Sequence, residues 1–216
     1  MFASCLALTL CAACGQSPSP PAPPPAESAA PRTVYPANIS RARTELPAGY
    51  EVGDLAGRSS PAAFWGLGPQ WTADPAQCGV LAQPAAPEAP VRGWSASGPG
   101  GIVYAAVTDS ATGLNPALRG ECLAWTVSAG PTAAQVALVD GPPVDGAETV
   151  GMITDATTVV EGGTETRSRA ETFNAYFDGY VATVTVVTDP GSAGPALPPD
   201  FAATLLVATV AALRGG

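Results

Sequence analysis

Runs rich in valine, threonine and aromatic residues fill the middle and the later part of the chain. Glycine, proline or asparagine separates these runs, and the short run YEVGDL at 50–55 alternates apolar and polar positions. Both features are typical of β-strands, whose side chains point alternately to the two faces of a sheet. The sequence therefore predicts further strands over four segments, which are 91–98, 101–109, 121–130 and 134–140.

Two later segments, 148–160 and 164–189, have the same β-rich character. Asp178–Gly179 interrupts the second of them, and an Asp-Gly pair favours the two-residue turn of a β-hairpin. The segment GPGG at 98–101 predicts another turn. It is not a phosphate-binding loop, because no helix and no lysine follow it.

Helical patterns flank the predicted strands. Residues 33–47 carry apolar side chains along one side and predict a short helix. Two helical turns are predicted at 60–68 and 72–82, because each begins with a capping side chain, Ser60 or Asp74, directly before a proline.

The last apolar segment, 201–214, follows Pro199 and Asp200. A helix there has so little polar surface that it must lie against the sheet. Strands in sequence-adjacent pairs with helices at the two ends predict an α+β fold. In this fold an antiparallel β-sheet packs against N-terminal short helices and a C-terminal helix.

The N-terminal part of the chain has a different composition. Residues 1–13 are uncharged and largely apolar, and they are too few to span a bilayer, which takes roughly 20 apolar residues. Small residues stand directly before Cys14, as in the lipobox of bacterial lipoproteins, and half of the positions from 18 to 31 are proline. We predict a lipoprotein signal peptide at 1–13 and a lipidated Cys14 with a Pro-rich tether over 14–33. An ordinary secretory signal is the alternative.

This organisation leaves residues 34–216 as a single envelope domain, anchored to the cell membrane on its extracytoplasmic face. The net charge of −9 and the pI near 4.3 argue against a nucleic-acid partner and against adsorption to anionic lipid headgroups. Attachment to the membrane is therefore predicted to come from the acyl chains on Cys14.

The five cysteines divide between these regions. Cys5 and Cys11 lie in the predicted signal peptide, Cys14 is the predicted lipid acceptor, and Cys78 and Cys122 remain in the domain. Two cysteines in an exported domain most simply form one disulfide. Two buried free thiols or a redox pair are the alternatives, and the lack of CxxC spacing disfavours the redox pair.

The chain contains no histidine, and all nine basic residues are arginine. This composition excludes Ser–His–Asp and Cys–His catalysis, histidine metal sites, P-loops and Schiff bases, so no cofactor or metal is expected. Catalysis by a pair of carboxylates, as in glycosidases, remains chemically possible. The candidate pairs are Glu161 with Glu165 and Glu171 with Asp178. Neither pair stands in a recognisable setting, and the domain is predicted not to be an enzyme. The acidic loop at 140–148 does not match the spacing of an EF-hand, so an ordinary charged turn is expected rather than a Ca²⁺ site.

Four tryptophans stand out among the few aromatic residues: Trp65, Trp71, Trp94 and Trp125. Residues of this size next to strands or short helices usually belong to the core. The functional alternative is that Phe64, Trp65 and Trp71, in the glycine-rich FWGLGPQW segment, line an apolar ligand-binding cleft.

Four stretches resemble an uncharacterised domain found mainly in mycobacterial lipoproteins: YPANISRARTELPAGYEVGDLAGRSSPAAFWG, WTADPAQCGVLA, SGPGGIVYAAV and PPDFAATLLVATVAALR. The resemblance covers roughly residues 34 to 214. The chain is more distantly similar to the extracellular sensor domain of the mycobacterial serine/threonine kinase PknH. These resemblances imply an α+β domain in the cell envelope with a cleft for a ligand. The chain has one candidate disulfide where the kinase sensor has two, and the family supplies no catalytic residue.

The sequence thus predicts a lipid-anchored cell-envelope protein whose non-catalytic, sensor-like domain binds an apolar small ligand or an envelope protein partner. A carboxylate-dependent hydrolase acting on envelope glycans and an envelope scaffold protein are the alternatives. Two close carboxylates in a cleft would favour the hydrolase, and a deep apolar cleft would favour the binding domain. A broad exposed patch without a cleft would favour the scaffold.

Overall fold

The computed structural model describes residues 32–55, 60–110, 112–188 and 194–216. The predicted signal peptide at 1–13, the predicted lipidation site Cys14 and nearly all of the predicted tether at 14–33 lie outside these described residues. None of the described helices is long and apolar enough to cross a membrane.

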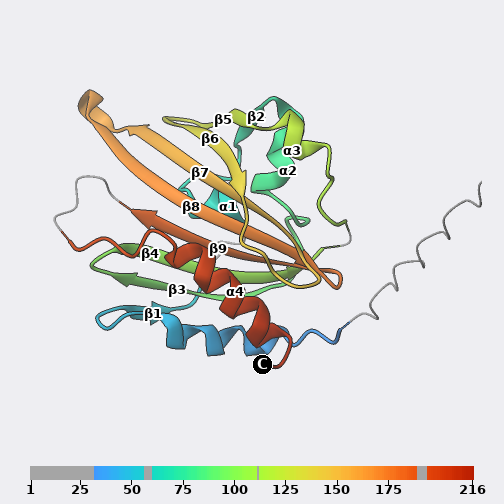
Figure 1. Cartoon of the computed structure of the whole chain (residues 1–216). Coiled ribbons are helices and arrows are strands. Elements are labelled where there is room, and N and C mark those ends of the chain that lie inside the picture. Colours follow the sequence, from blue (N-terminus) through green and yellow to red (C-terminus); the bar gives the residue numbers. More distant parts are fainter. Residues whose placement is uncertain (1–31, 56–59, 111, 189–193) are drawn as a thin grey trace, which may run out of the picture. The chain divides into compact units, whose positions relative to one another are not determined.

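Nine strands of the described chain form one sheet, in which every neighbouring pair is antiparallel (Figure 1). The order across the sheet is β1-β3-β4-β9-β8-β7-β6-β5-β2. The strands are β1 Glu51–Gly53, β2 Thr72–Asp74, β3 Val91–Gly98, β4 Gly101–Asp109, β5 Ala124–Ala129, β6 Thr132–Asp140, β7 Glu148–Val159, β8 Glu165–Phe177 and β9 Tyr180–Thr188.

Helices cover both faces of this sheet. One face carries the 3₁₀ helix η1 and the C-terminal helix α4, and the other carries the short helices α1, η2, α2 and α3 (Figure 1). The described helices are η1 Pro36–Glu45, α1 Pro61–Phe64, η2 Ala76–Cys78, α2 Gly79–Ala82, α3 Leu118–Glu121, η3 Glu161–Gly163 and α4 Phe201–Leu213. The fold is α+β with an antiparallel sheet, so the predicted fold class is confirmed.

The predicted turns lie where the sequence indicated. Gly98 pairs with Gly101 at the β3–β4 turn. At the β8–β9 turn, Asp178 and Gly179 have φ angles of 49° and 81°. Positive φ at both central residues is what a type I′ hairpin turn requires, and aspartate and glycine tolerate it better than other residues.

Two predicted boundaries are wrong. The strand expected from residue 121 begins at Ala124, because Leu118–Glu121 forms α3 before the chain enters the sheet. The helix expected from residue 72 begins at Ala76. Asp74 is not its cap, because it ends β2, where its backbone pairs with Thr126 of β5. By contrast, Ser60 accepts a hydrogen bond from the backbone N–H of Ala63 and caps α1 as predicted.

The apolar C-terminal helix accounts for the core on its face of the sheet. Leu205, Leu206 and Val210 of α4 are at most 1% exposed and belong to the same core cluster as the fully buried Trp94 of β3. The indole nitrogen of Trp94 donates a hydrogen bond of 3.0 Å to the backbone oxygen of Ile39, which attaches η1 to the same core. The helix predicted at 33–47 is therefore present as a 3₁₀ helix that packs on the sheet beside α4.

A buried arginine fixes the end of α4. Arg214 forms an ion pair of 3.3 Å with Asp178, and the two side chains are 11% and 15% exposed. The same guanidinium donates to the backbone oxygens of Asp145 and Gly146 and lies 4.9 Å from the ring centroid of Phe177. This contact ties the C-terminus of the helix to the β6–β7 loop and the β8–β9 turn.

Candidate functional site

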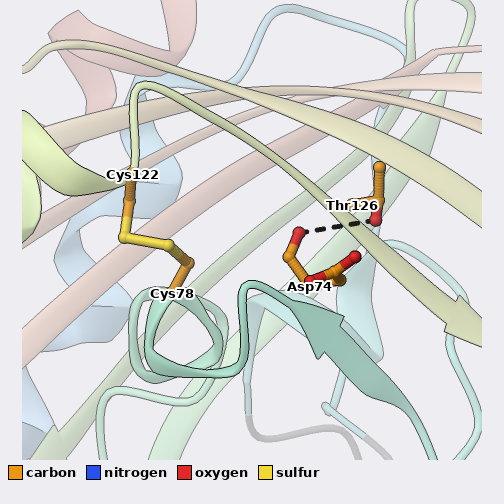
Figure 2. Close-up of a disulfide and its surroundings, with 4 residues drawn as sticks. All are labelled: Asp74, Cys78, Cys122 and Thr126. Atoms are coloured by element: carbon orange, nitrogen blue, oxygen red, sulfur yellow. Dashed lines mark hydrogen bonds between the residues drawn. A yellow bond between two sulfur atoms is a disulfide. The ribbon is translucent and has the colours of Figure 1, made fainter.

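Cys78 and Cys122 form the predicted disulfide. Their Sγ atoms are 2.04 Å apart, their Cα atoms 5.6 Å apart, and both residues are fully buried. Figure 2 shows that the bond joins the helical turn at Cys78, the end of η2, to Cys122 in the short connection between α3 and β5. Beside it, the hydroxyl of Thr126 donates a long hydrogen bond of 3.5 Å to the backbone oxygen of Asp74, across the β2–β5 pair.

A cavity of about 250 Å³ lies beside the segments that the disulfide joins. It is formed by the η2–α2 segment, by the loop that leads into α3, and by the sheet at β8. Its lining residues are Gln77, Val80, Leu81, Pro84, Thr112, Gly113, Leu114, Asn115, Leu118 and Tyr176. Gln77 is next to Cys78 in the chain, and Leu118 is one helical turn before Cys122, so the disulfide holds two walls of the cavity together.

The walls of this cavity are mostly apolar, with the polar side chains of Gln77, Thr112, Asn115 and Tyr176 among them, and they carry no charge. Leu81, Leu114 and Leu118 are 1%, 6% and 5% exposed and belong to one core cluster. None of the described lining residues has an ionisable side chain other than Tyr176. The side-chain oxygen of Asn115 accepts a hydrogen bond from the backbone N–H of Ala117, which fixes the loop at the mouth.

Tyr176 is supported from within the sheet by a buried polar group. Asn174, two residues earlier on the same face of β8, donates to the backbone oxygen of Leu81 at 3.1 Å and accepts from the hydroxyl of Thr183 at 2.7 Å. Burial raises the pKa of Tyr176 to about 12, and a side-chain hydrogen bond from Asn174 opposes part of this rise. The phenol therefore stays neutral at physiological pH.

A second, smaller cavity of about 160 Å³ lies between the start of α4 and strands β8 and β9. Its lining includes Arg169, Glu171, Leu197 and Phe201. Burial raises the pKa of the half-buried Glu171, and the nearby charge of Arg169 opposes that increase. Arg169 also forms an ion pair of 2.9 Å with Asp155.

Two of the three residues proposed for the alternative aromatic cleft, Phe64 and Trp65, lie in the core. Phe64 is 2% exposed and stacks on Tyr104 with a centroid distance of 4.6 Å. Trp65 is 3% exposed and donates a hydrogen bond of 2.9 Å from its indole nitrogen to the hydroxyl of Thr172. Both rings enter the core because Ser60 and Pro61 start a helical turn directly on the sheet, which leaves no ring surface for a ligand.

Trp71, the third residue of that prediction, is half-buried. Its ring packs against α2, where a Cβ on Gly79 would be 3.3 Å from it. Neither of the two cavities includes Phe64, Trp65 or Trp71 in its lining. The core interpretation of the aromatic segment is therefore the one that the packing supports.

The candidate carboxylate pair of Glu171 and Asp178 is not brought together as a hydrolase would need. Glu171 lies within β8 and Asp178 in the turn after it, seven residues along an extended chain and so about 20 Å away. Glu165 forms an exposed ion pair with Arg167. Among the described residues, no group of three or more acidic or cysteine side chains could hold a metal ion. Asp145, in the acidic loop, instead pairs with Arg32, whose hydrogen bond and charge lower the pKa of its carboxyl.

An antiparallel sheet with helices on both faces defines an α+β domain, and of the two cavities described above the larger one, beside the disulfide, has an uncharged lining. The chain belongs to the DUF5642 family of domains of unknown function, whose model matches residues 35–214.

The fold is also found in a solved structure. An X-ray structure of an uncharacterised protein from Mycobacterium smegmatis, the Rv0999 ortholog, is similar with a TM-score of 0.60 and 20% sequence identity. The similarity covers 84% of this chain and 98% of that one. At this identity the likeness concerns the fold alone. The sequence has no significant match among curated proteins.

Proposed function

We propose that this chain is a lipid-anchored protein of the cell envelope whose domain binds a small ligand, or a small group of a protein partner, without catalysing a reaction. The observation that carries the proposal is the cavity of about 250 Å³ beside the disulfide. Apolar pockets with a few placed polar groups are the usual small-ligand sites of proteins. The similarity of the sequence to the sensor domain of the kinase PknH supports the same role.

The chemistry of the cavities supports binding rather than hydrolysis. Glycoside hydrolysis commonly needs two carboxyl groups about 5 to 10 Å apart. Among the described residues that line the two cavities, Glu171 is the one carboxylate, and it lies in the smaller cavity. A chain without histidine and lysine offers few other general bases.

The scaffold alternative has less support. The half of the sheet that α4 leaves uncovered exposes mainly small or polar side chains, such as Thr126, Gln135 and Ala137. Surfaces that hold other proteins stably usually present a continuous apolar patch, and the exposed large apolar side chains of β6 and β7 on this half include Val139 and Val159 beside these small and polar ones.

Membrane attachment through Cys14 is part of the proposal and rests on the sequence. The small residues before Cys14 and the prolines after it have the organisation of a lipidated cysteine followed by a spacer. In this proposal the acyl chains hold the domain at the extracytoplasmic face of the cell membrane.

Native mass spectrometry of the full chain purified from its own host tests the binding proposal. Val80 lines the cavity and is 47% exposed, so Val80→Trp fills the site without entering the core. Val52→Trp is the matched control, because Val52 is 43% exposed and lies on the edge strand β1. We expect a bound mass on the wild type and on Val52→Trp that is lost from Val80→Trp. A wild type without any bound ligand or partner, or a Val80→Trp variant that retains the same mass, would contradict the proposal.

A further inference from the structure

We infer that the cavity beside the disulfide selects an uncharged, largely apolar molecule that carries one hydrogen-bond acceptor, such as a carbonyl oxygen, for the hydroxyl of Tyr176. This inference rests on the proposed function, since it names the ligand class for the same site. It follows from the charge of the lining, the hydrogen bonding of Tyr176 and the size of the cavity.

The charge around the cavity disfavours an anion. No arginine and no carboxylate belongs to the described lining. Arg119 of α3, which directly follows the lining residue Leu118 in sequence, already donates a hydrogen bond of 2.6 Å to the backbone oxygen of Thr149. Beside the lining residue Gly113, a carboxylate oxygen of Glu148 lies 4.0 Å from the position that a Cβ on this glycine would take. An anionic ligand would lose its hydration without gaining a cation and would approach this carboxylate.

Tyr176 supplies the polar feature of the site. Asn174, its neighbour on the same face of β8, has other partners within the protein, because its amide donates to the backbone oxygen of Leu81 and its side-chain oxygen accepts from Thr183. The described residues show no hydrogen bond that the Tyr176 hydroxyl donates. A ligand that fills the cavity removes water from this hydroxyl, and a polar group that loses water without gaining a partner costs binding free energy. A ligand acceptor in the cavity provides that partner.

The size of the cavity sets the scale of the ligand. An apolar protein cavity of about 150 Å³ holds a benzene molecule. A cavity of about 250 Å³ therefore fits a benzene-sized ring with a short substituent. Leu114 and Leu118 would contact the ring, and the substituent would carry the acceptor toward Tyr176.

Three matched probes separate these features. Acetophenone has a ring and a carbonyl oxygen, ethylbenzene has a similar shape without the acceptor, and benzoate adds a negative charge. Each is titrated into the full chain in detergent micelles, and binding is followed by the NMR methyl signals of Leu114 and Leu118, which report on the cavity itself. The variants are Tyr176→Phe, which keeps the ring and removes the hydroxyl, and Val80→Trp, which fills the site.

We expect acetophenone to bind the wild type more tightly than ethylbenzene, and benzoate to bind weakest. Tyr176→Phe should weaken the binding of acetophenone by about two- to ten-fold, which corresponds to the loss of one neutral hydrogen bond. The affinity for ethylbenzene should stay unchanged. Val80→Trp should abolish the methyl shifts. A thermal melt at neutral pH confirms that both variants are folded.

Two results would overturn the inference while leaving the proposed function standing. These are equal binding of acetophenone to wild type and Tyr176→Phe, or benzoate binding as tightly as acetophenone. A third result removes the inference and the cavity as the binding site together: no probe shifts the methyl signals of the wild type, or Val80→Trp responds as the wild type does.

Discussion

Removing the disulfide should destabilise the domain by about 4 kcal/mol. The double substitution Cys78→Ala with Cys122→Ala opens a loop whose ends are 44 residues apart in sequence. In the chain-entropy model, closing a loop of this length lowers the entropy of the unfolded chain by about 13 cal/mol/K, which is about 4 kcal/mol at 25 °C. For a domain of this size, that change lowers the melting temperature by about 8 to 16 °C.

Urea unfolding and a thermal melt of the wild type and the double variant measure this loss. The slope of the free energy against urea should rise in the double variant, because the unfolded chain without the cross-link is more expanded and exposes more surface. Unreduced wild type, unfolded in urea, should take up no alkylating reagent at Cys78 or Cys122. A difference below about 1 kcal/mol, or two thiols that alkylate without reduction, would refute the reasoning that this bond constrains the unfolded chain.

Three further changes test other parts of the account. Arg214→Ala leaves the poorly exposed carboxylate of Asp178 without its partner and should lower the free energy of unfolding in urea by about 3–5 kcal/mol. Arg167→Ala, at a side chain that is 73% exposed, should lower it by less than about 1 kcal/mol. Equal losses in the two variants would contradict the role of the Arg214–Asp178 pair. The pKa of Tyr176 is about 12 in the folded domain and about 10 in the unfolded chain, so the unfolded chain releases this proton at lower pH. The free energy of unfolding should therefore fall by about 3 kcal/mol as the pH rises from 10 to 12. Tyr176→Phe should lose that part of the pH dependence, and an unchanged alkaline profile would show that the phenol is not desolvated. Cys14→Ser protein should lose its acyl label and leave the membrane fraction; retention of both would rule out lipidation at this residue.

The sequence predicted those parts of the fold that depend on local signals. The β3–β4 and β8–β9 hairpins lie where Gly98–Gly101 and Asp178–Gly179 indicated, because each turn needs residues that tolerate unusual backbone angles. The Ser60 cap lies where expected because its hydroxyl accepts a hydrogen bond from the backbone N–H of Ala63 at the start of α1. Asp74 has an equally good cap signal, but its backbone pairs with β5, more than 50 residues later, and the longer-range contact prevails.

The candidate site shows the limit of local signals more clearly. The cavity combines residues around 77–84, residues 112–118 and Tyr176, which meet only when the disulfide and the sheet bring them together. No motif in the sequence marks these segments as one site. The cysteine count predicted the bond between Cys78 and Cys122. From that bond the sequence indicated only that the residues next to Cys78 lie close to the residues next to Cys122.

The aromatic segment shows a different limit, because the sequence left two interpretations open. FWGLGPQW looks like an exposed glycine-rich loop or like a core segment, and the sequence is compatible with both. The deciding contacts are made with Tyr104 on β4 and Thr172 on β8, which are distant in sequence from Phe64 and Trp65. Such packing partners are set by the sheet order, which a single sequence does not display.

A crystal structure of the protein purified from its own host tests the central claim most directly. The account predicts difference electron density for a small uncharged molecule between Leu114, Leu118 and the hydroxyl of Tyr176, with an acceptor atom within about 3 Å of that hydroxyl. Density for water alone in this cavity, or a ligand seated instead in the cavity beside Glu171, would contradict it.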